Sequence, residues 1–170
     1  IYNCSVICYD GAILGIVPKK VLNNGIICEN RWFNSSCNLP CDAVLQIGNK
    51  EIPFTQQVVF NTDSYSFGIE IGNESEAPLT PGALLATCGA EIILNSSSNE
   101  EVADGNRQTQ NRIEAASRCY KCGYVYTNSG WGESTSNATY SGYAAVAECG
   151  TIIAESRRFL TAGHITITQI

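Results

Sequence analysis

The order of strands and helices between Phe67 and Phe159 constrains the fold more than any other feature of the sequence. Short apolar runs alternate there with segments that carry helix start and stop signals, which predicts a strand-helix-strand-helix-strand order. Thr80 and Pro81 are typical of a helix start, and Gly89 is typical of a helix end. The expected strands are 66–71, 91–94 and 124–127, and the expected helices are 81–89 and 101–122.

Hairpin patterns flank this run on both sides. The sequence predicts strands over 2–8 and 12–17, and later over 143–148 and 151–156. It also predicts a strand over 52–60 that Pro53 interrupts, and a last strand over 165–170. We therefore expect an α/β (mixed α+β) fold, in which helices cover a mixed sheet.

Composition limits the class of protein. With 170 residues and 44% hydrophobic content, the chain can bury one core, which predicts one domain over 1–170. The net charge of −6 and the lack of a Lys/Arg cluster argue against nucleic acid as a partner. No apolar stretch approaches the roughly 20 residues that cross a bilayer, so no membrane association is expected.

The nine cysteines favour a cytoplasmic protein with reduced thiols, because an odd number does not suit a disulfide framework. Cys4, Cys8, Cys88 and Cys149 lie in apolar strand or helix patterns and are expected to be buried. Five Asn-x-Ser/Thr sequons would suit a secreted protein. Two of them fall within or beside expected buried strands, so we interpret the set as a chance product of composition.

Both ends of the sequence lie within strand-like patterns. Met is absent, including at position 1, and the chain opens at Ile1 inside an apolar run. The other end finishes in the alternating run HITITQI. We therefore expect an internal fragment of a protein that continues on both sides.

Three stretches of the sequence resemble one enzyme family. They are YNCSVICYDGAILGIVPKKVL, ENRWF and the run from Phe67 to Phe159, whereas 34–47 shows no resemblance. The chain is similar to the glutaminase domain of glutamine-dependent NAD synthetase, which is a nitrilase-like carbon–nitrogen hydrolase domain. The resemblance implies an αββα sandwich of two mixed sheets, truncated here at both ends, and association into a homo-oligomer.

The family resemblance also implies a catalytic set, in which Cys, Glu and Lys hydrolyse the side-chain amide of glutamine. Lys19 in IVPKKVL stands at the lysine position, and Glu29 in ENRWF matches a second glutamate that lies near the lysine. A solvated loop lysine is the alternative for Lys19, and a surface carboxylate paired with Arg31 is the alternative for Glu29. The base itself lies upstream in the family and has no counterpart in this chain.

The segment EIGNE departs from the family's E-I-C-E-D motif at the nucleophile. Gly72 stands at the Cys position, and Asn73 stands at the acidic position that follows. Glycine has no side chain that could attack an amide, so we expect the chain itself to be inactive. Cys28 is the thiol expected nearest the pocket, but the family has no catalytic thiol there.

Two turns match the family's substrate pocket. Ser98 and Asn99 match the S-A-S-N turn that holds the amino-acid end of glutamine, and a helix that starts there could offer backbone amides to a carboxylate. Capping of that helix is an equally good interpretation. Glu133, Ser134 and Thr135 match a turn that shapes the pocket rim, whereas the family's YLPNYG loop is replaced by VLNNG.

The resemblance implies a glutamine amidohydrolase domain whose ammonia is used by a synthetase domain in the same polypeptide. ATP and deamido-NAD are expected only in that missing synthetase domain, so no cofactor is expected in this chain. The alternative is a non-catalytic nitrilase-like assembly domain that kept the fold and subunit contacts.

Two other patterns suggest different chemistry. The pairs Cys37-x3-Cys41 and Cys119-x2-Cys122 could supply four zinc ligands, but the first spacer is irregular and the second pair ends a predicted helix. We therefore expect no metal. His164 is the only histidine, and we expect it in an edge strand rather than as a base.

Overall fold

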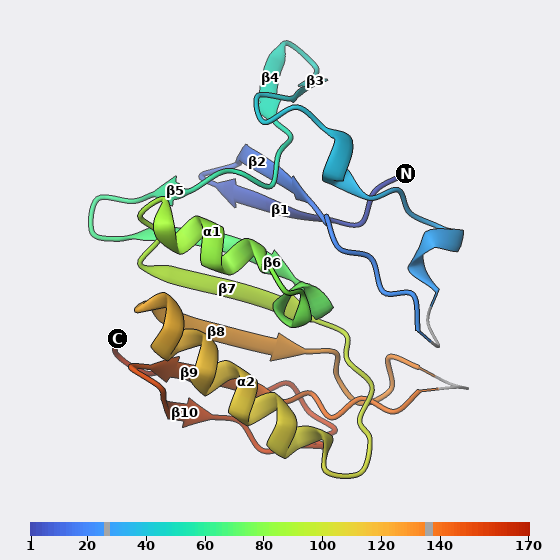
Figure 1. The fold of residues 1–170 in the computed structure, drawn as a ribbon, viewed down its shortest axis with the longest axis vertical. Helices are drawn as coiled ribbons and strands as arrows, with labels where there is room; N and C mark the ends of the chain where they lie inside the picture. The colour runs from blue at the N-terminus through green and yellow to red at the C-terminus, as the bar shows by residue number, and fades with distance from the viewer. Residues whose placement is uncertain (26–27, 135–137) are drawn as a thin grey trace.

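A computed structural model describes residues 1–25, 28–134 and 138–170, and within them a six-stranded mixed sheet forms the centre of the fold (Figure 1). Its strands lie in the order β10-β9-β8-β7-β6-β5. Strands β6, β7 and β8 are parallel, and the outer strands pair antiparallel. The bounds are β5 Phe60–Asn61, β6 Ser66–Ile71, β7 Ile92–Ser97, β8 Gly123–Asn128, β9 Ala144–Glu148 and β10 Thr151–Glu155.

The helices α1 (Pro81–Thr87) and α2 (Gly105–Tyr120) cover one face of this sheet (Figure 1). Thr80 caps α1 as predicted, because its Oγ1 accepts a hydrogen bond from the amide of Ala83 (3.1 Å). Helix α2 begins later than predicted, since Asp104 has a left-handed conformation (φ 64°) that cannot continue a helix. No helix of the described residues is long and apolar enough to cross a membrane. The core under the helices contains Leu85, Ile93, Ile113, Ala116 and Tyr124.

A hairpin of β1 (Cys4–Tyr9) and β2 (Ala12–Pro18) packs against the opposite face of the sheet. Side chains alternate along β6, so Ile69 and Ile71 point away from the helices and contact this hairpin. Val17 and Phe60 complete the apolar contact. Helices therefore cover one face and a second, smaller sheet covers part of the other, which confirms the predicted mixed α/β fold.

The stretch between β2 and β6 differs most from expectation. The single strand predicted over 52–60 is wrong: β4 (Lys50–Pro53) ends where it was expected to continue, and β5 begins at Phe60. Strand β4 instead pairs with β3 (Val44–Ile47) in a hairpin that the sequence analysis missed. The described residues also contain the 3-10 helices η1 Glu29–Arg31, η2 Ser36–Asn38 and η3 Gly72–Glu76.

The C-terminal segment 165–170 was also predicted wrongly, because it forms no strand. Ile165 and Ile167 are exposed, and His164 lies outside any strand. A strand needs a neighbouring strand that supplies hydrogen bonds, and 165–170 pairs with none of the described strands, so β10 remains the edge of the sheet.

All nine cysteines are free, but most are not buried. Cys122 is buried and Cys4 is half-buried, whereas Cys8, Cys88 and Cys149 are exposed. The prediction of buried thiols is therefore wrong for these three, because Cys8 is exposed near the end of β1, Cys88 follows the end of α1, and Cys149 lies in the turn between β9 and β10.

Candidate functional site

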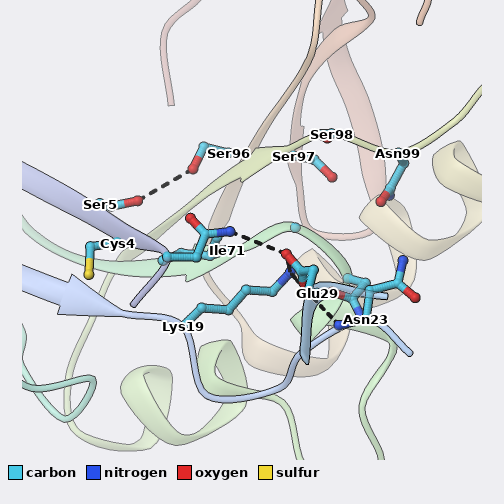
Figure 2. A pocket seen from close by; sticks show the side chains of 13 residues that line it. Cys4, Ser5, Lys19, Asn23, Glu29, Ile71, Ser96, Ser97, Ser98 and Asn99 are labelled. Carbon is cyan, nitrogen blue, oxygen red and sulfur yellow. Dashed lines mark hydrogen bonds and ion pairs between the residues drawn. The ribbon is translucent and has the colours of Figure 1, made fainter. Parts of the chain in front are cut away.

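A cavity of about 240 Å³ opens where β2, β6 and β7 end (Figure 2). Strands β6 and β7 are parallel, so their carboxyl ends meet at one edge of the sheet, which is where α/β folds place ligands. The residues assigned to catalysis or substrate binding from the sequence all line this cavity: Lys19, Glu29, Gly72, Asn73, Ser98 and Asn99.

Lys19 follows β2 directly and forms a buried ion pair with Glu29 (Figure 2). Its Nζ donates to Oε1 (2.9 Å) and Oε2 (2.7 Å) of Glu29, and the two side chains are only 4% and 12% exposed. A solvated loop lysine is therefore excluded. Glu29 pairs with Lys19 rather than with Arg31, so the alternative of a surface carboxylate is excluded as well.

Two further donors fix the carboxylate of Glu29. The backbone amide of Asn23 donates to Oε2 (2.6 Å), and the side-chain amide of Asn3 donates to Oε1 (3.2 Å). Each oxygen of Glu29 thus accepts a hydrogen bond besides the one from Lys19. The carboxylate, held in this way, orients the ammonium of Lys19. The lysine is thus held in one position before any ligand arrives.

Gly72 follows β6 directly and faces this ammonium. A Cβ atom built on Gly72 would lie 3.3 Å from Nζ of Lys19. Gly72 has a left-handed conformation (φ 58°), in which glycine is favoured over any residue with a side chain. A side chain at position 72 would therefore point at Lys19, and this chain has none.

Asn95 on β7 holds the backbone of Gly72. Its Nδ2 donates to the Gly72 carbonyl (3.2 Å) and to Oε2 of Glu70 (3.3 Å), and the side chain is buried. Glu70 also accepts from the hydroxyl of Tyr124 (2.5 Å) and from the amide of Gly82 (3.1 Å). Burial raises the pKa of Glu70, and hydrogen bonds from Tyr124, Gly82 and Asn95 lower it in part.

Glu74 in η3 is a second buried carboxylate that the sequence analysis did not single out. Its Oε1 accepts from the amides of Lys20 (2.6 Å) and Val21 (3.1 Å) and from Gln56 Nε2 (2.7 Å). Its Oε2 accepts from the amide of Ile71 (2.8 Å). Glu74 thereby ties the end of β6 to the loop that follows Lys19. The EIGNE segment carries both Glu70 and Glu74, but nothing in its sequence indicates that these two carboxylates are buried.

Ser98 and Asn99 lie on the loop after β7 rather than at a helix start. Helix α2 begins only at Gly105. Ser98 and Asn99 therefore neither cap this helix nor lie at its N-terminal backbone amides. Asn99 is instead fixed by Asn128, whose Oδ1 accepts from the Asn99 amide (2.8 Å). Glu133 and Ser134 do not line the cavity, and Thr135 lies outside the described residues.

Cys4, and not Cys28, is the thiol that lines the cavity. Cys4 also packs against the apolar cluster of Ile16, Ile52 and Phe54, and burial raises the pKa of its thiol. A raised pKa keeps the sulfur protonated and a poor nucleophile. Among residues 1–25, 28–134 and 138–170, no group of three or more His, Cys, Asp or Glu side chains is arranged to hold a metal ion.

The sequence and the fold are both similar to those of known proteins, although no protein-family model matches. The glutamine-dependent NAD(+) synthetase of Saccharomyces cerevisiae is 32% identical over 93% of this chain and 23% of its own length. The crystal structure of a glutamine-dependent NAD(+) synthetase from Cytophaga hutchinsonii superposes with a TM-score of 0.77 at 25% identity, over 92% of this chain and 25% of that protein.

The fold is shared more widely. Nit3 of Saccharomyces cerevisiae, a member of branch 10 of the nitrilase superfamily, has a TM-score of 0.70 at 19% identity, over 93% of this chain and 50% of Nit3. The chain spans about a quarter of the length of the curated relatives it matches.

Proposed function

Because the chain is a nitrilase-like segment of the family that includes the glutamine-dependent NAD(+) synthetases, we propose that it is the amidohydrolase-type part of such a protein and does not itself hydrolyse glutamine. Covalent amide hydrolysis requires a nucleophile, a base and a donor to the developing oxyanion. Lys19 can serve as the donor, since it is held in place by Glu29.

The observation that carries the proposal is the geometry at Gly72. The position lies at the end of β6 and a Cβ there would be 3.3 Å from the Lys19 ammonium, so a thiol at this position would reach the site. Glycine leaves the site without an attacking atom. Cys4 does not replace it, because its sulfur belongs to an apolar cluster and its pKa is raised.

The larger setting is part of the proposal, and its support is that the chain matches about a quarter of longer glutamine-dependent NAD(+) synthetases. In this proposal the chain is one part of a cytoplasmic, homo-oligomeric protein whose synthetase domain uses ATP and deamido-NAD. Glutamine is the molecule that the cavity accepts, and Asn73, Ser98 and Asn99 contact it. A non-catalytic assembly domain is the second candidate, and it is favoured by the same observation, since packing does not need a nucleophile.

Glutamate release from glutamine tests the proposal directly. The purified chain should release no glutamate above a heat-denatured control, and Gly72→Cys should restore none, because Asn73 still replaces the acidic neighbour. Release that a thiol alkylator abolishes would show a working nucleophile and overturn the proposal. Alkylation of the Cys4→Ser variant tells whether Cys4 is that nucleophile.

A further inference from the structure

A second cavity, of about 420 Å³, lies on the face of the sheet that the helices do not cover. Tyr124 and Tyr126 on β8 belong to the core under the helices, so Val125 between them points to the opposite face. Val146 on β9 pairs with Val125, and both valines line the cavity. Small-molecule sites have volumes of about 300–1,000 Å³, so this space is large enough for a ligand.

Two hydroxyl groups at this cavity lack hydrogen-bond partners. Ser141 is only 1% exposed, and its Oγ forms no hydrogen bond within residues 1–25, 28–134 and 138–170. The Oγ1 atom of Thr166, in the segment that follows β10, is buried and has no partner within the same ranges. Both residues line the cavity. Buried polar atoms nearly always have a partner, so the two hydroxyls point to a molecule that occupies this space.

The side chains around the cavity favour a negatively charged ligand. The chain has 16 Asp and Glu residues and a net charge of −6, yet none of the described residues that line this cavity is acidic. Arg157 lines it and forms no ion pair in the described part of the chain, whereas its neighbour Arg158 pairs with Glu101 (2.9 Å). His164, the only histidine, also lines it. A guanidinium and hydroxyl groups can all donate hydrogen bonds to an oxyanion.

Apolar side chains form another part of the lining, among them Val125, Val146 and Leu160. A bare inorganic anion would leave these side chains without a contact, and a purely apolar molecule would leave the hydroxyls without a partner. The lining therefore calls for a ligand that combines charged oxygens with an apolar body.

We infer that this second cavity binds a small organic oxyanion, in which an apolar body carries a carboxylate or a phosphate group. Arg157 and the hydroxyls of Ser141 and Thr166 donate to the oxygens of the ligand, and the valines contact its body. The second cavity shares no lining residue with the cavity of Lys19, so the inference is independent of the proposed function.

Calorimetric titration of the chain in a phosphate-free buffer tests the inference. Phenyl phosphate, benzoate and benzyl alcohol are the probes, because they share a ring and differ in their oxygens. We expect saturable binding of at least one of the two anions, tighter by about tenfold or more than that of the neutral alcohol, since the alcohol cannot accept charge-assisted hydrogen bonds. The anion that binds more tightly identifies the charged group as phosphate or carboxylate.

Arg157→Gln is the informative variant, and Arg158→Gln is its matched control. Arg157 is exposed and forms no ion pair among the described residues, so its replacement should leave the melting temperature unchanged. It should weaken binding of the anion by about tenfold or more. Arg158 does not line the cavity, so Arg158→Gln should bind the anion as the unaltered chain does.

Ser141→Ala tests the buried hydroxyl separately. Because Ser141 Oγ has no partner in the described residues, its removal should not lower the melting temperature of the free chain. It should weaken binding of the anion by about threefold or more, since one donor is lost.

The outcomes decide the inference in either direction. Saturable anion binding that Arg157→Gln and Ser141→Ala weaken, and that Arg158→Gln does not, supports it. The inference is overturned if neither anion binds saturably, if benzyl alcohol binds as tightly as the anions, if the two arginine variants bind equally, or if Ser141→Ala binds as the unaltered chain does. None of these results bears on glutamine hydrolysis at the cavity of Lys19, so the proposed function stands or falls separately.

Discussion

Lys19 shows, at the scale of a single residue, how tightly the site is arranged. Its ammonium is buried against Glu29, whose oxygens also accept from Asn3 and Asn23. Removing one partner of a buried ion pair leaves the other charge uncompensated, which costs about 3–5 kcal/mol. Lys19 and Glu29 therefore contribute to the stability of the fold.

Lys19→Met should accordingly lower the free energy of unfolding by about 3–5 kcal/mol, as measured by urea denaturation. Lys20→Met is the matched control, because the neighbouring lysine makes its bond through its backbone amide and forms no ion pair among the described residues. An unfolding free energy for Lys19→Met within 1 kcal/mol of the control would mean that the pair is not buried in solution.

Glu70 makes the stability of the chain depend on pH. Burial raises its pKa above the ordinary value of 4.5, so the carboxyl group binds its proton more tightly in the folded protein than in the unfolded chain. The stabilisation is complete below the unfolded-state pKa and is lost as the pH rises through the folded-state pKa. As the pH rises above 4.5, the unaltered chain should lose stability relative to Glu70→Gln, whose side chain does not titrate.

Thermal unfolding at several pH values measures this difference. Glu91→Gln is the control. Glu91 accepts a hydrogen bond from the backbone amide of Ser66 at the start of β6, so this variant removes a carboxylate that lies outside the buried network of Glu70. A difference between the unaltered chain and Glu70→Gln that does not change with pH would contradict the prediction.

At the scale of the element, η3 joins two segments that the sequence keeps far apart. Glu74 accepts four hydrogen bonds and so fastens the loop after β2 to the end of β6. The position of Lys19 relative to Gly72 depends on this connection. A hydrogen bond to a charged group contributes about 1.5–3 kcal/mol, so the connection is strong.

Glu74→Ala should therefore free the loop after β2. Hydrogen exchange of the Lys20 and Val21 amides should become at least about tenfold faster, since both lose their acceptor. Ser75→Ala, which removes only a 3.3 Å bond to the Gly72 carbonyl, should leave these amides protected. Equal exchange in the two variants would argue against a role for Glu74 in holding the loop.

Elements were predictable where local signals agreed with each other. The order β6-α1-β7-α2-β8 follows from apolar runs, the Thr80 cap and stop signals, and the structure keeps that order. The β3–β4 hairpin was missed because β3 is exposed along its whole length, which leaves no burial pattern to detect. The strand over 165–170 was wrong because alternation cannot reveal whether a partner strand exists.

At the scale of the whole molecule, the site could be anticipated only as far as the family resemblance reached. It named Lys19, Glu29 and Gly72, and the structure brings them into one cavity. Glu70, Glu74 and Asn95 were missed, since only the packed chain shows that these polar residues are buried. Sequence patterns report periodicity and turns, whereas burial of a charge depends on distant segments that supply its partners.

The left-handed backbone at Gly72 has a consequence for stability. A residue with a side chain costs about 1–2 kcal/mol in this conformation, and glycine does not. Any residue other than glycine at position 72, cysteine included, therefore either carries this cost or requires the backbone at the end of β6 to change. An attacking group and the present backbone are thus in competition at this one position.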